Sequence, residues 1–370
     1  MKRGWIFWDK NELPEAEFFQ RIEKLKSAMR AEKLDAVVIY GDAHQSGNLA
    51  YLTHFFPYAD TGAFVMPVDS PPRLFTTHAY RNMPWFNTIT WVQDIICTNF
   101  IGRECADYLA SINKPFQKIG LVSAQALPYP IFEAVQKKLG CEFLDFSAAF
   151  EALRILKSER ELAFIQKAAA IAEDSFKELA AAIHPEMSGF DIAAELELSV
   201  RRRGAEDLFC FIQPDGSPEG LTWPDSRRIQ GYFSVEIAVE YDGYWAKLGR
   251  TLSLDGSFQA FRPVIERYTQ VCLQFLEDEF SAQAPSPFVE GLRSRLSGIE
   301  RLRPVRLLVD FGLEPYWGTH VLKSEREAIR LKNQMALYLQ ACLDFDNQMR
   351  LLRTDTFMIR DSRPILLTPS

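Results

Sequence analysis

The stretch YFSVEIAVEYDGYWAKLGRTLSL, residues 232–254, contains two strands and the turn that joins them. Asp242–Gly243 tolerates positive φ and is typical of a two-residue type I′ hairpin turn. Apolar and polar residues alternate before this turn, so one face of the first strand is apolar and the other carries carboxylates. Pairing the strands through the turn places Ala238 opposite Lys247, with Glu236 one pair further along. The sequence therefore predicts a hairpin on which a carboxylate and an ammonium share one face.

Length and composition indicate a globular protein of two domains. A chain of 370 residues exceeds one ordinary domain, and 47% hydrophobic with 25% charged residues is globular composition. We place the boundary near residue 150 and predict domains 1–150 and 151–370. The net charge of −7 argues against nucleic acid or an anionic membrane surface as a partner. We expect no membrane-spanning helix, because no apolar run reaches about 18 residues.

Cysteine and histidine positions give no sign of a metal site. The six cysteines lie far apart without a CxxC pair, which indicates reduced core thiols in a cytoplasmic protein. His44, His54 and His78 have no acidic partner at metal-ligand spacing. We interpret these three histidines as structural or surface residues.

The first half of the chain alternates between helix and strand patterns, which predicts an α/β domain. We expect helices at 14–33, 101–113 and 129–139, and strands at 34–40, 62–68 (GAFVMPV), 73–77 (RLFTT), 88–92 (TITWV), 118–123 and 142–146.

The second half begins with helices and continues mostly with strands, which predicts an α+β domain. Ser158 is expected to cap a helix that begins at Glu159. We expect helices within 147–184 and at 188–203, 259–280 and 324–333, and strands at 207–213, 305–310, 335–343 and 356–360 besides the hairpin.

Five segments, in this order, resemble the creatinase/aminopeptidase P/prolidase superfamily. They are RIEKLKSAMRAEKLDAVVIYG (21–41), NLAYLTHF (48–55), LRILKSERELAFIQKAAAIAEDSF (153–176), IHPEMSGFDIAAELELSVRRRGAED (183–207) and the segment 222–256 that contains the hairpin. The resemblance implies a creatinase-type N-terminal α/β domain followed by an α+β "pita-bread" domain. It covers residues 20–255 well and 256–370 more weakly, and it implies a homodimer.

Active members of this family hold two divalent metals, about 4 Å apart, through two Asp, one His and two Glu, and the metals activate a water. The resemblance matches the two Asp positions with Glu236 and, eleven residues on, Lys247. It matches the histidine with His320, and the two Glu positions with Gln340 and Thr354. An ammonium repels a metal cation, and an amide and a hydroxyl replace two carboxylates. We therefore predict that no dimetal site and no cofactor is present.

Three functions stay open at this point, and we favour the first of them. The first is a metal-independent enzyme on a small amino-acid-like, amide or guanidino substrate, in which Glu236, Lys247 and His320 are catalytic. Leu221 stands where a family histidine is expected, which argues against creatine hydrolysis itself. The second is an inactive protein that binds a small molecule, a short peptide or a partner, and the third is a metal-dependent Xaa-Pro peptidase. Predicted substrate-binding residues are Trp223, Tyr244, Trp317, Gln340 and Thr354.

Overall fold

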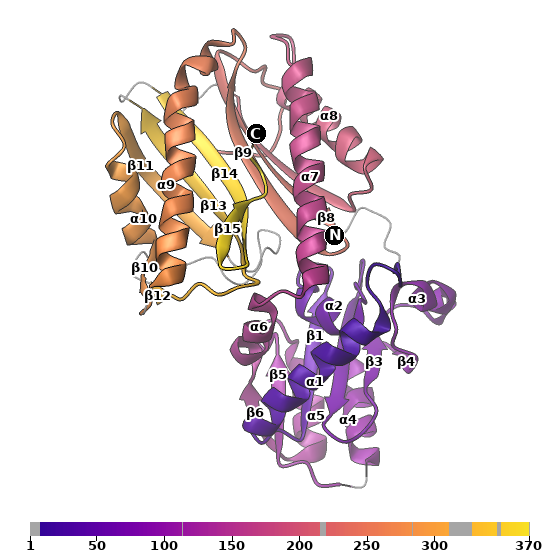
Figure 1. Cartoon of the computed structure of the whole chain (residues 1–370). Helices are drawn as coiled ribbons and strands as arrows, with labels where there is room; N and C mark the ends of the chain where they lie inside the picture. The colour runs from indigo at the N-terminus through magenta and orange to yellow at the C-terminus, as the bar shows by residue number, and fades with distance from the viewer. Residues whose placement is uncertain are drawn as a thin grey trace. The chain divides into compact units, whose positions relative to one another are not determined.

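The computed structural model describes residues 8–112, 114–214, 220–282, 284–310, 328–345 and 349–369. The chain divides into two compact units, residues 1–154 and 155–370 (Figure 1). The boundary predicted near residue 150 lies inside helix α6 (Ser147–Ile155). His320 and Trp317, two predicted site residues, lie outside the described residues.

The N-terminal unit is built on a six-stranded mixed sheet in the order β4-β3-β2-β1-β5-β6. Its strands are β1 (Ala36–Asp42), β2 (Thr61–Pro67), β3 (Arg73–Thr76), β4 (Ile95–Cys97), β5 (Lys118–Val122) and β6 (Glu142–Asp145). Its helices before α6 are α1 (Glu15–Ala31), α2 (Gly47–Thr53), α3 (Met83–Ile89), α4 (Ile101–Ser111) and α5 (Tyr129–Leu139), with a 3₁₀ turn at Tyr80–Asn82.

Strand alternation divides the core of this unit into two layers. Val37, Ile39 and Phe64 pack against apolar residues of α1, α2, α3 and α6. Val38 and Val65, which point the other way, pack against α4 and α5. Helices therefore cover both faces of the sheet, as the sequence predicts for an α/β domain.

The C-terminal unit is built on a seven-stranded antiparallel sheet in the order β11-β13-β14-β9-β8-β7, with β15 on the edge of β14. The strands are β7 (Asp207–Gln213), β8 (Tyr232–Tyr241), β9 (Tyr244–Ser253), β11 (Leu302–Asp310), β13 (Ala336–Phe345), β14 (Met349–Arg360) and β15 (Arg363–Leu366), with a small separate pair of β10 (Ser286–Pro287) and β12 (Ala328–Ile329). The helices are α7 (Glu159–Ala182), α8 (Gly189–Arg202), α9 (Arg262–Ser281) and α10 (Phe288–Ser297), and a 3₁₀ turn spans Ser257–Phe261.

Helices α7, α8, α9 and α10, the helices in the described part of this unit, cover one face of the large sheet (Figure 1). Helices α7 and α8 pack on β7, β8 and β9, and helices α9 and α10 pack on β11, β13 and β14. Two capping boxes start the first two helices, one between Ser158 and Glu161 and one between Ser188 and Asp191. The cap predicted at Ser158 is confirmed, and so is the α/β plus α+β fold class.

The predicted hairpin is confirmed in turn type and in register. Asp242 and Gly243 have φ values of 49° and 82°, as a type I′ turn requires. Ala238 pairs with Lys247 and Glu236 pairs with Gly249.

Two predicted elements are wrong where the structure describes them. Residues 88–92 do not form a strand, because Thr88 and Ile89 end helix α3, whose buried Phe86 and Ile89 lie three residues apart. The helix expected at 324–333 is absent from its described part, 328–333, where β12 pairs with β10 instead. Tertiary pairing overrides local helix propensity there.

The histidine interpretation agrees with the structure, since His54 and His78 are buried in the N-terminal unit and His44 is exposed.

Throughout the described part of the chain, no helix combines the length and the apolar character needed to cross a membrane.

Candidate functional site

The candidate site lies on the face of the C-terminal sheet that is opposite to the four helices. Val235, Ile237 and Leu248 pack against α7 and α8, so Glu236 and Lys247 point to the other side. On strand β13, which β14 separates from β9, Leu339 and Ala341 pack under α9 and α10, so Gln340 also points away from the helices. We call this the site face, and its opposite the helix face.

The pairing register brings three predicted site residues into one row across four strands. Glu236 of β8 pairs with Gly249 of β9, Gly249 with Thr354 of β14, and Thr354 with Gln340 of β13. These three side chains occupy positions that the family resemblance assigns to metal ligands. Gln340 and Thr354, which are 104 and 118 residues from Glu236 in the sequence, thus lie in one cluster with it.

Hydrogen bonds hold this row together around one carboxylate. Oε2 of Glu236 accepts a hydrogen bond from Nε2 of Gln340 at 2.5 Å and another from Oγ1 of Thr354 at 2.5 Å. A carboxylate only accepts, so the amide of Gln340 must turn its nitrogen toward Glu236. Short bonds to an ionised acceptor are stronger than those between neutral groups.

Gly249 makes this contact possible because it has no side chain between Glu236 and Thr354. A Cβ at Gly249 would lie 2.6 Å from Oγ1 and 2.9 Å from Cβ of Thr354. Both distances are shorter than real carbon contacts allow. The glycine therefore lets the side chain of Thr354 reach across β9 to the carboxylate.

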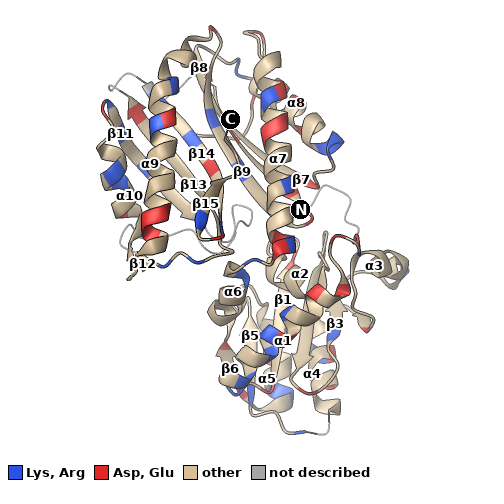
Figure 2. Cartoon of the chain, in the orientation of Figure 1, with Lys and Arg blue, Asp and Glu red and all other residues tan. Residues whose placement is uncertain are grey.

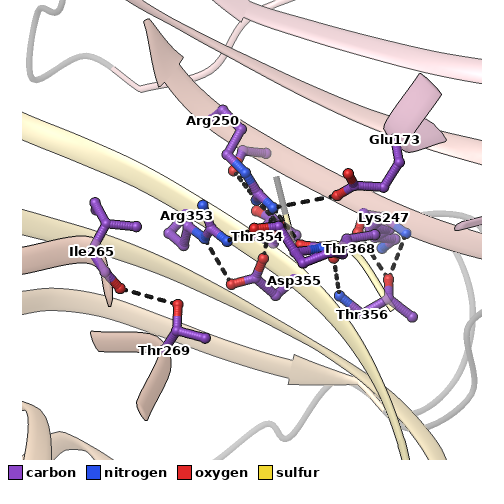
Figure 3. Close-up of polar contacts among 12 residues, drawn as sticks. Glu173, Lys247, Arg250, Ile265, Thr269, Arg353, Thr354, Asp355, Thr356 and Thr368 are labelled. Carbon is purple, nitrogen blue, oxygen red and sulfur yellow. Dashed lines mark hydrogen bonds and ion pairs between the residues drawn. The ribbon is translucent and has the colours of Figure 1, made fainter. Parts of the chain in front are cut away.

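Lys247 lies in the adjacent row of the site face. Its Nζ is 3.6 Å from the ring centroid of Tyr338, which is a cation–π contact. Its backbone N–H and C=O both bond to the hydroxyl of Thr356, at 2.9 and 2.8 Å (Figure 3). The predicted ion pair between Lys247 and Glu236 stays a prediction, while their common face follows from the register.

The row is almost closed to solvent. The exposed fractions are 1% for Glu236, 2% for Lys247, 7% for Gln340 and 0% for Thr354. Desolvated charges are costly unless they are paired or hydrogen-bonded, and Glu236 meets this condition through its two hydrogen bonds. The ammonium of Lys247 contacts the face of Tyr338, which also stabilises a buried cation.

Aromatic rings border the row along edge strand β7. Trp223 lies 4.6 Å from Phe211 and 6.2 Å from Phe209, and Phe209 stacks on Trp245 at 5.4 Å, all between ring centroids. Phe211 pairs with Glu236 and Phe209 with Ala238 in the sheet. The predicted site residue Trp223 therefore lies beside the row.

Tyr244, another predicted substrate-binding residue, does not join the cluster. Its ring stacks on Phe164 of α7 at 5.5 Å, and its hydroxyl donates to Oε1 of Glu161 at 3.0 Å. Both contacts lie on the helix face, because Tyr244 is three residues from Lys247 along β9.

The sequence reasoning missed three residues of this site: Gly249, Tyr338 and Thr356. The period of two along a strand was the available signal for Tyr338 and Thr356, which lie two positions from Gln340 and Thr354. No local signal marks Gly249, because its role depends on which strand pairs with β9 on its far side.

The residues at this site do not fit a dimetal centre. Divalent metals need several oxygen or imidazole lone pairs, whereas Gln340 and Thr354 direct hydrogens at the carboxylate and Lys247 carries a positive charge. In the described ranges, no group of three or more His, Cys, Asp or Glu side chains is arranged to hold a metal.

A second polar cluster lies on the helix face of the same sheet (Figure 3). Arg250 lies 2.9 Å from Asp355 and 3.9 Å from Glu173 of α7, and Nε of Arg353 lies 2.9 Å from Asp355. Figure 2 shows that strand β14 carries both basic and acidic positions. Burial lowers the pKa of Arg250 to about 10, although Asp355 and Glu173 act in the opposite direction.

Comparison with known proteins identifies both units. The model of the creatinase/prolidase N-terminal domain matches residues 21–156, and that of metallopeptidase family M24 matches residues 163–285. An uncharacterized peptidase, YqhT, of Bacillus subtilis is 27% identical over 247 residues, which are 63% of this chain and 65% of YqhT. A putative dipeptidase of the same organism, YkvY, is 21% identical over 75% of this chain and 77% of its own length.

Solved structures share the fold over nearly the whole chain. The prolidase from Pyrococcus horikoshii OT3 superposes with a TM-score of 0.73 at 19% identity, over 95% of this chain and 98% of its own. The Xaa-Pro dipeptidase from Bacillus anthracis has a TM-score of 0.72 at 19% identity, with the same coverage. At these identities the likeness shows the fold, and YqhT and YkvY both carry peptidase names.

Proposed function

We propose that this chain, which belongs to the creatinase/aminopeptidase P/prolidase superfamily, works without the dimetal centre of that family and binds a small amino-acid-like or short-peptide ligand on the site face. The observation that supports this proposal is the pair of hydrogen bonds from Gln340 and Thr354 to Oε2 of Glu236. Gln340 and Thr354 stand at positions that match metal ligands of the family, and here both donate hydrogen bonds to Glu236, which matches a third such position.

Charge supports the same proposal. With Lys247, Gln340 and Thr354 in place of carboxylates, the site face has lost three negative charges and gained one positive charge relative to the family pattern. Two dications near a buried ammonium repel it strongly, since the interior screens charges far less than water does. In the proposed state the ammonium of Lys247, which contacts the ring of Tyr338 on the same face as Glu236, stands in for the positive charge of a metal.

Burial favours binding over catalysis at this cluster. A general acid or base must reach its substrate directly or through one water. Glu236, Gln340 and Thr354 are buried and bonded to one another. The ligand is therefore expected to contact the aromatic border near Trp223, while the polar row fixes the shape of the sheet beneath it.

A metal-independent hydrolase is the second candidate, and the acid and base on one face of the hairpin favour it. In that case Glu236 moves a proton to or from an attacking water, Lys247 stabilises the developing oxyanion, and His320 assists as a second acid or base. Lys247→Ala then abolishes turnover. In a protein that only binds, the same variant changes stability or ligand affinity alone.

Metal content tests the proposal directly. Purified protein is incubated with Mn²⁺ or Zn²⁺, desalted and analysed for bound metal, and Xaa-Pro dipeptides are assayed with and without Mn²⁺. We expect well under one metal per chain and no Mn²⁺-dependent hydrolysis. A triple variant, Lys247→Asp with Gln340→Glu and Thr354→Glu, is the matched control and should retain more metal than the parent. About two metals per parent chain with Mn²⁺-dependent hydrolysis would overturn the proposal.

The homodimer and the cytoplasmic location that the sequence predicts stay predictions. Mass measurement by light scattering on the purified chain checks the first of them.

A further inference from the structure

Trp223 is an exposed aromatic side chain held in a fixed position at the border of the site face. Thr222 and Ile212 exchange backbone hydrogen bonds of 2.8 and 2.9 Å, which fasten this segment to the outer edge of β7. The ring of Trp223 then lies against Phe211, yet 56% of Trp223 is exposed. A large aromatic ring that is both fixed and open to solvent is suited to stack on a ligand.

Gln213 supplies a second and independent sign of a ligand. It lies two residues after Phe211 on β7, so its side chain is on the same face. Gln213 is only 5% exposed, and among the described residues its Nε2 has no hydrogen-bond partner. A buried donor without an acceptor is unfavourable, and a ligand oxygen would satisfy it.

We propose that Trp223 and Gln213 form a subsite for a small molecule that carries a flat ring and a hydrogen-bond acceptor, such as a carboxylate or acyl oxygen. Trp223 lies against Phe211, and Gln213 is two residues, or about 7 Å, further along β7, so one small molecule can reach both residues. N-aroyl amino acids have this form. The inference rests on the proposed function for the choice of face, and it names the ligand class for that face.

The donor character of Gln213 decides the polarity of the ligand. A tryptophan face also attracts cations, so Trp223 alone would fit an ammonium ligand as well. The amide hydrogens of Gln213 oppose a cation and favour an acceptor, above all a charged one. An anionic aromatic ligand satisfies both residues.

Three probes separate these features by calorimetry on the full chain without added metal. Hippurate (N-benzoylglycine) has the ring and the acceptors, acetylglycine lacks the ring, and phenethylammonium has the ring with a cationic donor. We expect hippurate to bind at least tenfold more tightly than either of the other two. Equal binding of all three, or no binding of hippurate, contradicts the proposal.

Two variants locate the subsite. Trp223→Ala and Gln213→Glu should each weaken hippurate binding at least tenfold, the second because a carboxylate repels the ligand in a side chain of nearly the same shape. Tyr129→Ala, at an exposed aromatic residue that begins α5 in the N-terminal unit, is the control and should leave binding unchanged. Circular dichroism melts identify any variant that does not fold, and unchanged binding in both folded variants overturns the proposal.

The subsite and the proposed function fail in different ways. Stoichiometric metal with Mn²⁺-dependent hydrolysis removes the proposed function, yet hippurate binding that depends on Trp223 and Gln213 would still stand. If hippurate does not bind and metal content is still near zero, the proposed subsite and its ligand class are wrong, while the proposed function still stands.

Discussion

The two faces of the C-terminal sheet bury charge in different ways. On the helix face, Arg250, Arg353, Asp355 and Glu173 form a balanced set of two cations and two anions, linked by ion pairs. On the site face, one carboxylate, Glu236, accepts hydrogen bonds from two neutral groups. Both sets lie near the junction of β9 and β14, and both are buried.

The difference lies in how each cluster is balanced, by ion pairs on the helix face and by hydrogen bonds from neutral groups on the site face. The helix-face cluster also fastens the chain, because Arg250 donates to the carbonyl oxygens of Thr354 and Thr368 at 2.7 and 2.5 Å. The side chains of the site-face row link β8, β13 and β14 in addition to the backbone pairing of the sheet.

The largest expected effect is on the helix face. Asp355→Asn keeps the shape of the side chain but leaves Arg250 and Arg353 without their shared carboxylate, so the free energy of unfolding should fall by about 3–5 kcal/mol. Urea denaturation of the C-terminal unit measures this change. Asp344→Asn is the control, because its partner Arg350 is also only partly buried, and it should cost at most about 1 kcal/mol. Equal losses in the two variants would show that the helix-face cluster contributes no special stability.

Gly249→Ala should have the next largest effect, at the boundary between the faces. The new Cβ collides with Thr354 and pushes β14 away from Glu236, which should cost about 1–3 kcal/mol. The same substitution in a Thr354→Ala background removes part of the collision and should cost less. A loss that is the same in both backgrounds would contradict the role assigned to Gly249.

The smallest expected effect is on the reactivity of a thiol. Measuring one cysteine on each face compares the two faces directly. Burial and, to a smaller degree, the negative charge of Glu236 raise the pKa of Cys342 on the site face. Glu236→Gln removes that charge and so should lower the pKa of Cys342, which raises its thiolate fraction and its alkylation rate at pH 8 by a few-fold.

Cys272 on the helix face is the internal control for this experiment, because it is fully buried and its pKa is also raised by burial. Mass spectrometry after iodoacetamide treatment should find Cys272 unmodified in both proteins. An unchanged rate at Cys342 would contradict the contribution of Glu236 to the raised pKa of this thiol.

Local patterns in the sequence predicted the hairpin well. Alternating polarity along 232–241 and the turn at Asp242–Gly243 depend only on near neighbours, so both the register and the shared face of Glu236 and Lys247 were predictable. The same local reasoning failed at 88–92 and in the described part of 324–333. Residues 88–89 end helix α3 instead of starting a strand, and residues 328–329 pair with β10, which is more than 40 positions away in the sequence.

The sequence by itself determined most of the elements, the register of the hairpin and the residue types that stand at Lys247, Gln340 and Thr354. Only the tertiary structure decided that Gln340 and Thr354 donate to Glu236, that Tyr338 covers Lys247 and that Tyr244 lies on the helix face. The physical reason is the junction of β9 with β14. That pairing joins residues about a hundred positions apart, and no property of either strand taken alone specifies it.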